Sequence, residues 1–185
     1  MRAFSRFAFV FSLLAGLLLL NGCAVYDVAV EERNPGQWAE DKKTSAIIEE
    51  RFLEDELVEY LHFDAYTYLG HVYVVGEYTS REQVDRAVEI ARGVKGVREV
   101  TTYLLPKRDD PTCGTAGNMN ISAKLKKALV NDSTIWSTNI DYEVLQCRVV
   151  LLGIVGTDEA KAAAEAHAAS VPGVRGIKSF ITVNR

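Results

Sequence analysis

The chain contains one pattern twice, and this internal repeat constrains its fold more than any other feature of the sequence. When the sequence is shifted by 77 positions, residues 45–100 align with residues 122–177 without a gap, and 13 of the 56 aligned pairs are identical. Most identical pairs are glycine, alanine or valine, the residue types of turns and close packing. Because a repeated sequence encodes a repeated structural unit, we expect two tandem domains of one fold.

Each copy opens with a segment that predicts an amphipathic helix. Ile48 and Phe52 stand four positions apart, as do the equivalent leucines of the second copy, and this spacing places both side chains on one helical face. Ser45, or Ser122 in the second copy, belongs to the residue types that cap helix starts. We therefore predict a helix of about three turns that such a serine can cap.

A hairpin is predicted next in each copy. β-branched and aromatic residues lie on both sides of a short break near Leu69, and near Gln146 in the second copy, which is typical of two strands joined by a turn. Gly76 and Gly153 stand toward the end of this segment, where glycine adopts a positive φ at little cost. We expect these two glycines to end the hairpin.

A second helix and a last strand complete each copy. Ser80 and Thr157 are cap residues that precede acidic residues in a first helical turn. Alanines at four-residue spacing let this helix lie close to a sheet, and they are Ala87 and Ala91 in the first copy and Ala164 and Ala168 in the second. Gly96 or Gly173 then turns the chain into the last apolar segment.

The predicted order of elements defines the fold class and the domains. Two helices and three strands form an α+β unit in which both helices pack on one face of a three-stranded mixed sheet. The expected divisions are a signal segment at 1–22, a tether at 23–43, a first domain at 44–106, a linker at 107–118 and a second domain at 119–185.

The N-terminus has the layout of a bacterial export signal. Arg2 and Arg6 precede a 14-residue apolar run, Phe7 to Leu20, which is too short to span a bilayer. The run ends in "LNGC", which resembles the lipobox of bacterial lipoproteins and implies acylation of Cys23. An ordinary secretory signal with an incidental cysteine is the alternative. In lipoproteins of this class an aspartate after the cysteine argues for retention at the inner membrane, and this chain has Ala24 there instead. The resemblance therefore implies an anchor on the periplasmic face of the outer membrane.

The remaining cysteines and the charges narrow the chemistry. With Cys23 assigned to lipid, Cys113 and Cys147 remain as a candidate disulfide in an oxidising compartment, and two independent thiols are the alternative. No further cysteine or histidine stands at metal-ligand spacing, so we expect no metal site. The net charge of −4 and the mixed signs along the chain argue against a nucleic-acid partner.

The sequence contains no pattern that predicts catalysis. The histidines at positions 62, 71 and 167 do not recur at matched positions of the two copies, and no nucleophile motif or phosphate-binding glycine loop accompanies them. We therefore expect a protein that is not an enzyme and that uses no cofactor and no small-molecule substrate.

The element order and several sequence stretches resemble the BON domain family. The resemblance rests on the hairpin glycines Gly76 and Gly153, on "EAKAAAEAHAASVPGVRGI" in the second copy and on "GVKGVREV" in the first. Together with the lipobox, it implies a periplasmic lipoprotein with two BON domains that supports envelope integrity. It further implies that the second BON domain binds anionic phospholipid through its opening helix.

The resemblance locates a candidate lipid-binding site in the second copy. In such lipoproteins an aromatic residue begins the opening helix, whereas this chain has Asn120 at that position. Met119 or Ile121 could insert instead, beside the three lysines Lys124, Lys126 and Lys127. The alternative is an ordinary solvated helix face. Trp136 could take the aromatic role or cap the core.

Two further interpretations stay open. Trp38 in the expected tether either docks onto the first domain, which we favour, or anchors at the lipid headgroups. The protein as a whole could also be an adaptor for an envelope protein, bound at an exposed sheet edge or between the domains, with lipid serving only as a tether.

Overall fold

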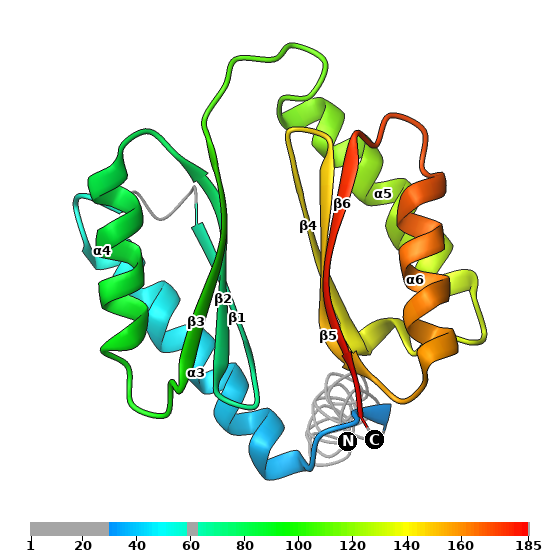
Figure 1. The fold of residues 1–185 in the computed structure, drawn as a ribbon, viewed down its shortest axis with the longest axis horizontal. Helices are drawn as coiled ribbons and strands as arrows, with labels where there is room; N and C mark the ends of the chain where they lie inside the picture. Colours follow the sequence, from blue (N-terminus) through cyan, green and yellow to red (C-terminus); the bar gives the residue numbers. More distant parts are fainter. Residues whose placement is uncertain (1–29, 59–62, 185) are drawn as a thin grey trace, which may run out of the picture.

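Two copies of one α+β unit form the protein, shown in Figure 1 as a computed structural model that describes residues 30–58 and 63–184. The first unit comprises α3 (Pro35–Glu54), β1 (Phe63–Tyr68), β2 (His71–Tyr78), α4 (Arg81–Arg92) and β3 (Glu99–Pro106). The second unit comprises α5 (Thr115–Asn131), the 3-10 turn Ser137–Asn139, β4 (Ile140–Leu145), β5 (Arg148–Val155), α6 (Asp158–Ser170) and β6 (Gly176–Val183). The expected signal segment, Cys23 and the start of the expected tether lie outside the described residues.

Each unit contains a mixed three-stranded sheet. The strand orders are β1-β2-β3 and β4-β5-β6, with an antiparallel hairpin first and a parallel last strand. The second helix of each unit supplies the crossover that a parallel pair requires. The predicted fold class is confirmed in both copies.

The hairpin turns lie where the sequence predicts them. Leu69 and Gln146 adopt positive φ angles of 52° and 50° between their strands. The hairpin pairing ends at Gly76 and Gly153 as predicted, because they are the last residues of β2 and β5 that pair with β1 and β4. Both strands then continue beside β3 and β6. Gly153 has φ 153°, and a Cβ built on it would lie 2.2 Å from the carbonyl oxygen of Asn139. This glycine therefore permits close strand approach inside the sheet rather than a chain reversal.

The second helices also follow their sequence signals. The Ser80 hydroxyl accepts a hydrogen bond from the Gln83 backbone amide at 3.3 Å, and the Thr157 hydroxyl accepts one from that of Ala160 at 3.0 Å. The four paired alanines of α4 and α6 are fully buried against the sheets. Close contact between helix and sheet is possible there because alanine adds only a methyl group.

The opening helices begin earlier than the sequence predicts. Asn34 caps α3 by accepting a hydrogen bond from the Gln37 amide at 2.9 Å, and α5 starts at Thr115, inside the expected linker. Ser45 and Ser122 therefore lie within helices and cap neither, and residues 35–43 of the expected tether are helical.

A polar buried residue explains why the start of α3 has no apolar pattern. Asp41 is buried and accepts hydrogen bonds from the backbone amides of Leu69 and Gly70 and from the Arg33 guanidinium. Arg33 itself donates to the Thr67 carbonyl oxygen and lies over the Tyr68 ring. This segment is therefore held on the first domain by polar contacts that a hydrophobic pattern cannot reveal.

The two sheets face each other across the middle of the molecule (Figure 1). Alternate residues of β2 and β5, among them Val75 and Leu152, are buried in a third apolar cluster between the sheets. The other alternate residues, among them Val74 and Leu151, face the helices of their own units. Both middle strands are consequently buried on both faces.

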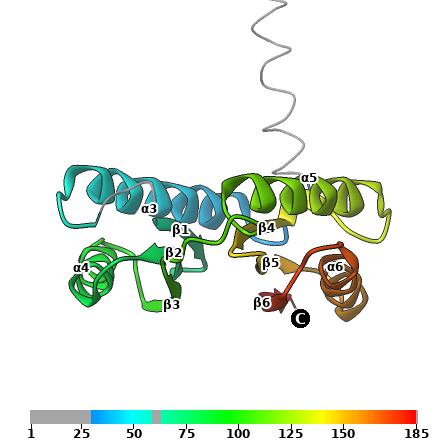
Figure 2. The same cartoon turned by 90° about the horizontal axis from the view of Figure 1, so that it is seen from above.

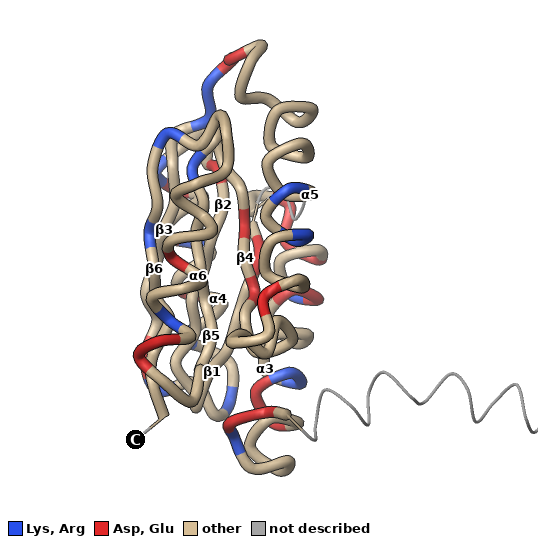
Figure 3. The backbone as a smooth tube through the Cα atoms, turned by 90° about the vertical axis from the view of Figure 1, so that its right-hand side faces the viewer, with Lys and Arg blue, Asp and Glu red and all other residues tan. Residues whose placement is uncertain are grey.

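The opening helices lie together on one side of the molecule. Figure 2 shows α3 and α5 as a single layer above the sheets, and Figure 3 shows both on the same side of all the strands. α4 and α6 lie at the outer flanks instead (Figure 1).

Candidate functional site

The exposed side of α5 combines apolar and basic residues. Met119 and Val130 are 66% and 60% exposed, large values for apolar side chains. We define the outer face of α5 as the exposed residues spaced along one side of the helix: Ala116, Met119, Ala123, Lys126, Lys127 and Val130. Lys124 is exposed at the margin of this face.

The charge of α5 has a single sign. Its sequence, TAGNMNISAKLKKALVN, contains three lysines and no acidic residue. Among residues 30–58 and 63–184, no carboxylate forms a salt bridge with any of these three lysines. The helix therefore presents three uncompensated positive charges beside exposed apolar groups, a combination that suits an anionic and partly apolar partner.

Ile121 does not belong to this surface, so the expectation that it inserts into lipid is wrong. Its side chain is 2% exposed and packs in the core of the second domain with Leu125 and Leu129. The spacing of these three residues, four positions each, is that of the buried helical stripe. That spacing was available in the sequence and could have excluded Ile121.

The two tryptophans differ in position and exposure. Trp136, which follows α5, is 53% exposed, whereas Trp38 is partly buried within α3. Trp136 is therefore the more accessible of the two tryptophans, and it lies near the end of α5.

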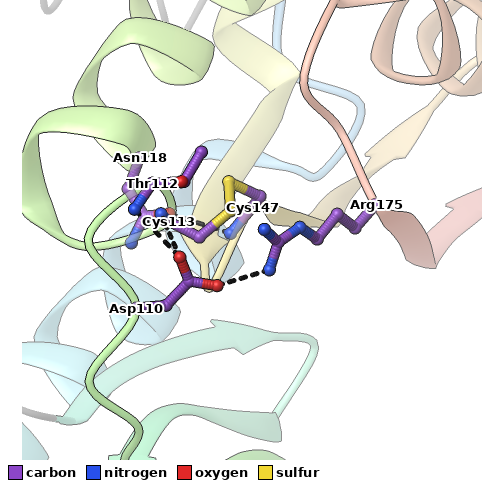
Figure 4. The surroundings of a disulfide bond; sticks show 6 residues. All are labelled: Asp110, Thr112, Cys113, Asn118, Cys147 and Arg175. Carbon is purple, nitrogen blue, oxygen red and sulfur yellow. Dashed lines mark hydrogen bonds and ion pairs between the residues drawn. A yellow bond between two sulfur atoms is a disulfide. The ribbon is translucent and has the colours of Figure 1, made fainter.

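A disulfide fixes the start of α5. Cys113 and Cys147 are bonded with their Cα atoms 5.1 Å apart. Asp110 accepts from the Cys113 amide and pairs with Arg175 at 2.5 Å, and Asn118 accepts from the Cys147 amide (Figure 4). The covalent bond thus joins the segment before α5 to the turn between β4 and β5, which holds the N-terminal end of the helix in place.

The interface behind the helix layer relates the two units reciprocally. β1 lies against β5, and β2 lies against β4, which occupy matching positions in the two copies. The Tyr66 hydroxyl donates to Glu143 at 2.5 Å, and these residues are 77 positions apart, the offset of the repeat. Tyr68 donates to Asp141 at 2.6 Å beside this pair. The units are therefore arranged as an approximate two-fold pair.

Several carboxylates lie close together at this interface. Burial raises the pKa of Asp64, and nearby Glu49 raises it further. Burial also raises the pKa of Glu143, although the hydrogen bond from Tyr66 opposes the shift. The pKa of Glu49 is raised by burial and lowered in part by Lys42, which also pairs with Asp141 at 3.7 Å.

We predict that acidification from about pH 7 to about pH 5 stabilises the folded protein. A carboxyl group with a raised pKa binds a proton more readily in the folded protein than in the unfolded chain. Its ionisation therefore destabilises the folded protein at neutral pH, and this cost disappears as the pH falls toward the pKa of the group in the unfolded chain. The midpoint of urea unfolding should be higher at the lower pH, and Asp64→Asn should flatten this dependence. A midpoint of urea unfolding that falls steadily as the pH is lowered from about 7 to about 5 would contradict the raised pKa values of these carboxyl groups.

Below about pH 4 the trend should reverse, because the pKa values of Asp55, Asp110 and Asp132 are lowered. Hydrogen bonds account for these shifts, from Arg86, Arg175 and Thr134 respectively, and the pKa of Asp132 falls to about 2. Protonation of these groups removes their contribution to folding.

The histidines in the described ranges have ordinary partners. His167 contacts Asp132 at 2.7 Å, and His71 contacts Thr101 at 2.8 Å; His62 lies outside the described residues. Within the same ranges no group of three or more metal-ligating side chains is close enough to bind an ion. The helices described there include none with an apolar stretch long enough to cross a bilayer.

Known proteins resemble this chain over most of its length. The "Osmotically-inducible protein Y" of Escherichia coli strain K12 is 25% identical over 146 residues, which cover 78% of this chain and 73% of that protein. The "Outer membrane lipoprotein DolP" of Haemophilus influenzae is 24% identical over 173 residues, which cover 88% of this chain and 89% of that protein.

The chain also resembles one solved structure distantly, and it matches one domain family twice. CdsD, a structural protein of the type III secretion system of Chlamydia trachomatis, matches with a TM-score of 0.31 and 12% identity over 78% of this chain and 63% of that chain, a similarity too low to support any inference. Residues 40–105 and 119–185, well over half of the chain, each match the BON domain. The chain therefore belongs to the BON domain family and contains two copies of the domain.

Proposed function

We propose that this protein is a lipid-anchored envelope protein at the periplasmic face of the outer membrane, where its second BON domain binds anionic phospholipid through the outer face of α5. The observation that carries the proposal is the joint exposure of Met119, Val130 and three lysines on one acid-free helix. Similarity to an outer membrane lipoprotein and the lipobox at Cys23 support the location. Support for envelope integrity is the cellular role that we infer from this location.

Simple energetics indicates a weak but measurable contact. Each lysine near an anionic leaflet contributes about 1 kcal/mol. Burial of the exposed parts of Met119 and Val130 adds roughly 1 kcal/mol each. The sum of about 5 kcal/mol corresponds to a dissociation constant of a few tenths of a millimolar. Such a contact orients a protein that its acyl chains already hold at the bilayer.

The start of the described chain keeps the domains near that anchor. The Asn139 side chain donates to the Val30 carbonyl at 2.7 Å, and the Asn184 side chain donates to the Glu32 carbonyl at 3.0 Å. Residues 30 and 32 are thus bound to the second domain. The six residues between Cys23 and Val30 can span only about 20 Å at full extension. The expected tether, residues 23–43, would have a longer reach.

The triple variant Lys124→Glu, Lys126→Glu, Lys127→Glu tests the proposed site. Using the chain from Ala24 to Arg185, we expect its affinity for vesicles of phosphatidylcholine and phosphatidylglycerol to fall by about 100-fold or more, because about 3 kcal/mol of attraction is lost. Flotation at millimolar lipid measures the bound fraction. Vesicles of phosphatidylcholine alone should bind even the unmodified chain poorly.

A matched control carries the same change in net charge elsewhere. Lys95→Glu, Lys161→Glu, Lys178→Glu places the reversals after α4, on α6 and on β6. We expect this variant to bind the anionic vesicles nearly as well as the unmodified chain. Equal binding by both triple variants and the unmodified chain would disprove the site.

An adaptor function is the second candidate. β3 and β6 are edge strands of their sheets, and an edge can accept an additional strand from a partner. The space between the sheets is filled by apolar side chains, so the edges are the better surface. Crosslinking in cells to one envelope protein through β3 or β6, together with absent vesicle binding, would favour this function.

A further inference from the structure

The first domain carries a helix face that lies level with the proposed lipid-binding face. α3 and α5 form one layer on the same side of both sheets (Figures 2 and 3). Their lengths of 20 and 17 residues correspond to about 30 and 25 Å. A flat bilayer that contacts the outer face of α5 therefore approaches the outward side of α3 as well.

The outward side of α3 has a chemistry that fits a bilayer surface only in part. Leu53 is 67% exposed, the highest value among the large apolar residues described. We define the outer face of α3 as the exposed residues opposite its buried side: Ala39, Lys42, Lys43, Ala46, Glu50, Leu53 and Glu54. This face therefore combines apolar groups and two lysines with two glutamates that an anionic bilayer repels.

We propose that the anionic lipid surface extends from the second domain onto the outer face of α3, where Lys43 strengthens and Glu50 weakens the contact. The inference rests on the proposed function and adds a second set of residues to it. Charges within about 8–10 Å of the headgroups are felt by the bilayer at physiological salt. The first domain then adjusts the affinity that the second domain provides.

Lys43 and Glu50 are suitable probes because both are exposed and carry opposite charges on one face of α3. Neither side chain forms a salt bridge with any residue of the described ranges. Lys42, by contrast, pairs with Asp141 at 3.7 Å, so its reversal would also disturb the domain interface. Both probe positions are exposed within α3, so reversing their charges leaves the core intact.

Opposite substitutions should change vesicle affinity in opposite directions. With the chain from Ala24 to Arg185 and vesicles of phosphatidylcholine and phosphatidylglycerol, Lys43→Glu should weaken binding about tenfold, and Glu50→Lys should strengthen it about tenfold. The double variant Lys43→Glu, Glu50→Lys should bind like the unmodified chain, because the two effects cancel. All these differences should shrink at high salt.

A second pair of substitutions separates local contact from net charge. Lys95→Glu and Asp85→Lys make the same changes of charge on and after α4, which lies outside the helix layer. We expect these variants to change binding by less than about twofold. If they match the α3 variants, net charge alone acts and the inference is overturned.

The remaining outcomes distinguish this inference from the proposed function. If the lysine reversals in α5 abolish binding while the α3 variants leave it unchanged, the second domain binds alone and the inference is wrong. If the unmodified chain fails to bind anionic vesicles, the proposed function and the inference both fail.

Discussion

The Leu152→Asp variant is expected to lose about 4 kcal/mol of folding free energy and to separate the two domains. Leu152 is fully buried between the sheets, beside Val75 and Val150. The aspartate would leave a charge without a cation partner in an apolar cluster, and such a group is costly unless the cluster opens to water. Small domains have total stabilities of about 5–15 kcal/mol, so this loss is a large share.

Urea unfolding followed by circular dichroism measures the effect. We expect a lower midpoint and a transition that divides into two, because each domain then unfolds without support from the other. Val130→Asp is the matched control, since this valine lies on the exposed side of α5, and its substitution should change stability by less than about 0.5 kcal/mol. A single transition at the original midpoint for Leu152→Asp would show that the sheets do not support each other.

A comparable loss, about 4 kcal/mol or more, is expected for Gly153→Ala. Two effects combine at this position: φ is 153°, which side chains rarely adopt, and the new Cβ would lie 2.2 Å from the Asn139 carbonyl oxygen. The clash involves backbone of the neighbouring segment, which no side-chain rotation can relieve. The pairing of Ile140 with Gly153 should therefore break.

Gly93→Ala provides the comparison for this substitution. Gly93 has φ −76°, and its nearest contact to a built Cβ is 3.4 Å. The alanine fits there and should be neutral or slightly stabilising, by up to about 0.5 kcal/mol. Hydrogen exchange of the β4 and β5 amides would locate the damage in Gly153→Ala, and retained protection of these amides would contradict the argument.

The fold was predictable because local patterns and the repeat agree. The caps Ser80 and Thr157 and the paired alanines depend on neighbours in the sequence, so their signals are visible in one chain. The start of α3 was not predictable in this way. Its buried side begins with Asp41, whose partners Leu69 and Gly70 are distant in sequence, so polar burial there looks like an unstructured polar segment.

The interface between the sheets had a signal in the sequence, but it is not the alternation of apolar and polar residues that indicates a strand with one buried face. In "RVVLLGIV" the apolar residues are continuous, and such a run is typical of a strand buried on both faces. For the candidate site, the exposure of Met119 and Lys127 follows from helical spacing, and the same spacing excludes Ile121. The contribution of α3 depends on how the domains are placed in space, which no local pattern encodes.

The reciprocal arrangement of the two units has a consequence for the residues at its centre. Two identical subunits in a symmetric homodimer would have to place like against like at such a position, tyrosine on tyrosine or carboxylate on carboxylate. Because both units belong to one chain, Tyr66 can instead face Glu143, a donor against an acceptor. The same freedom lets one opening helix have lysine as its only charged residue type while the other has acidic and basic residues. Covalent linkage therefore gives two structurally similar units surfaces of different charge.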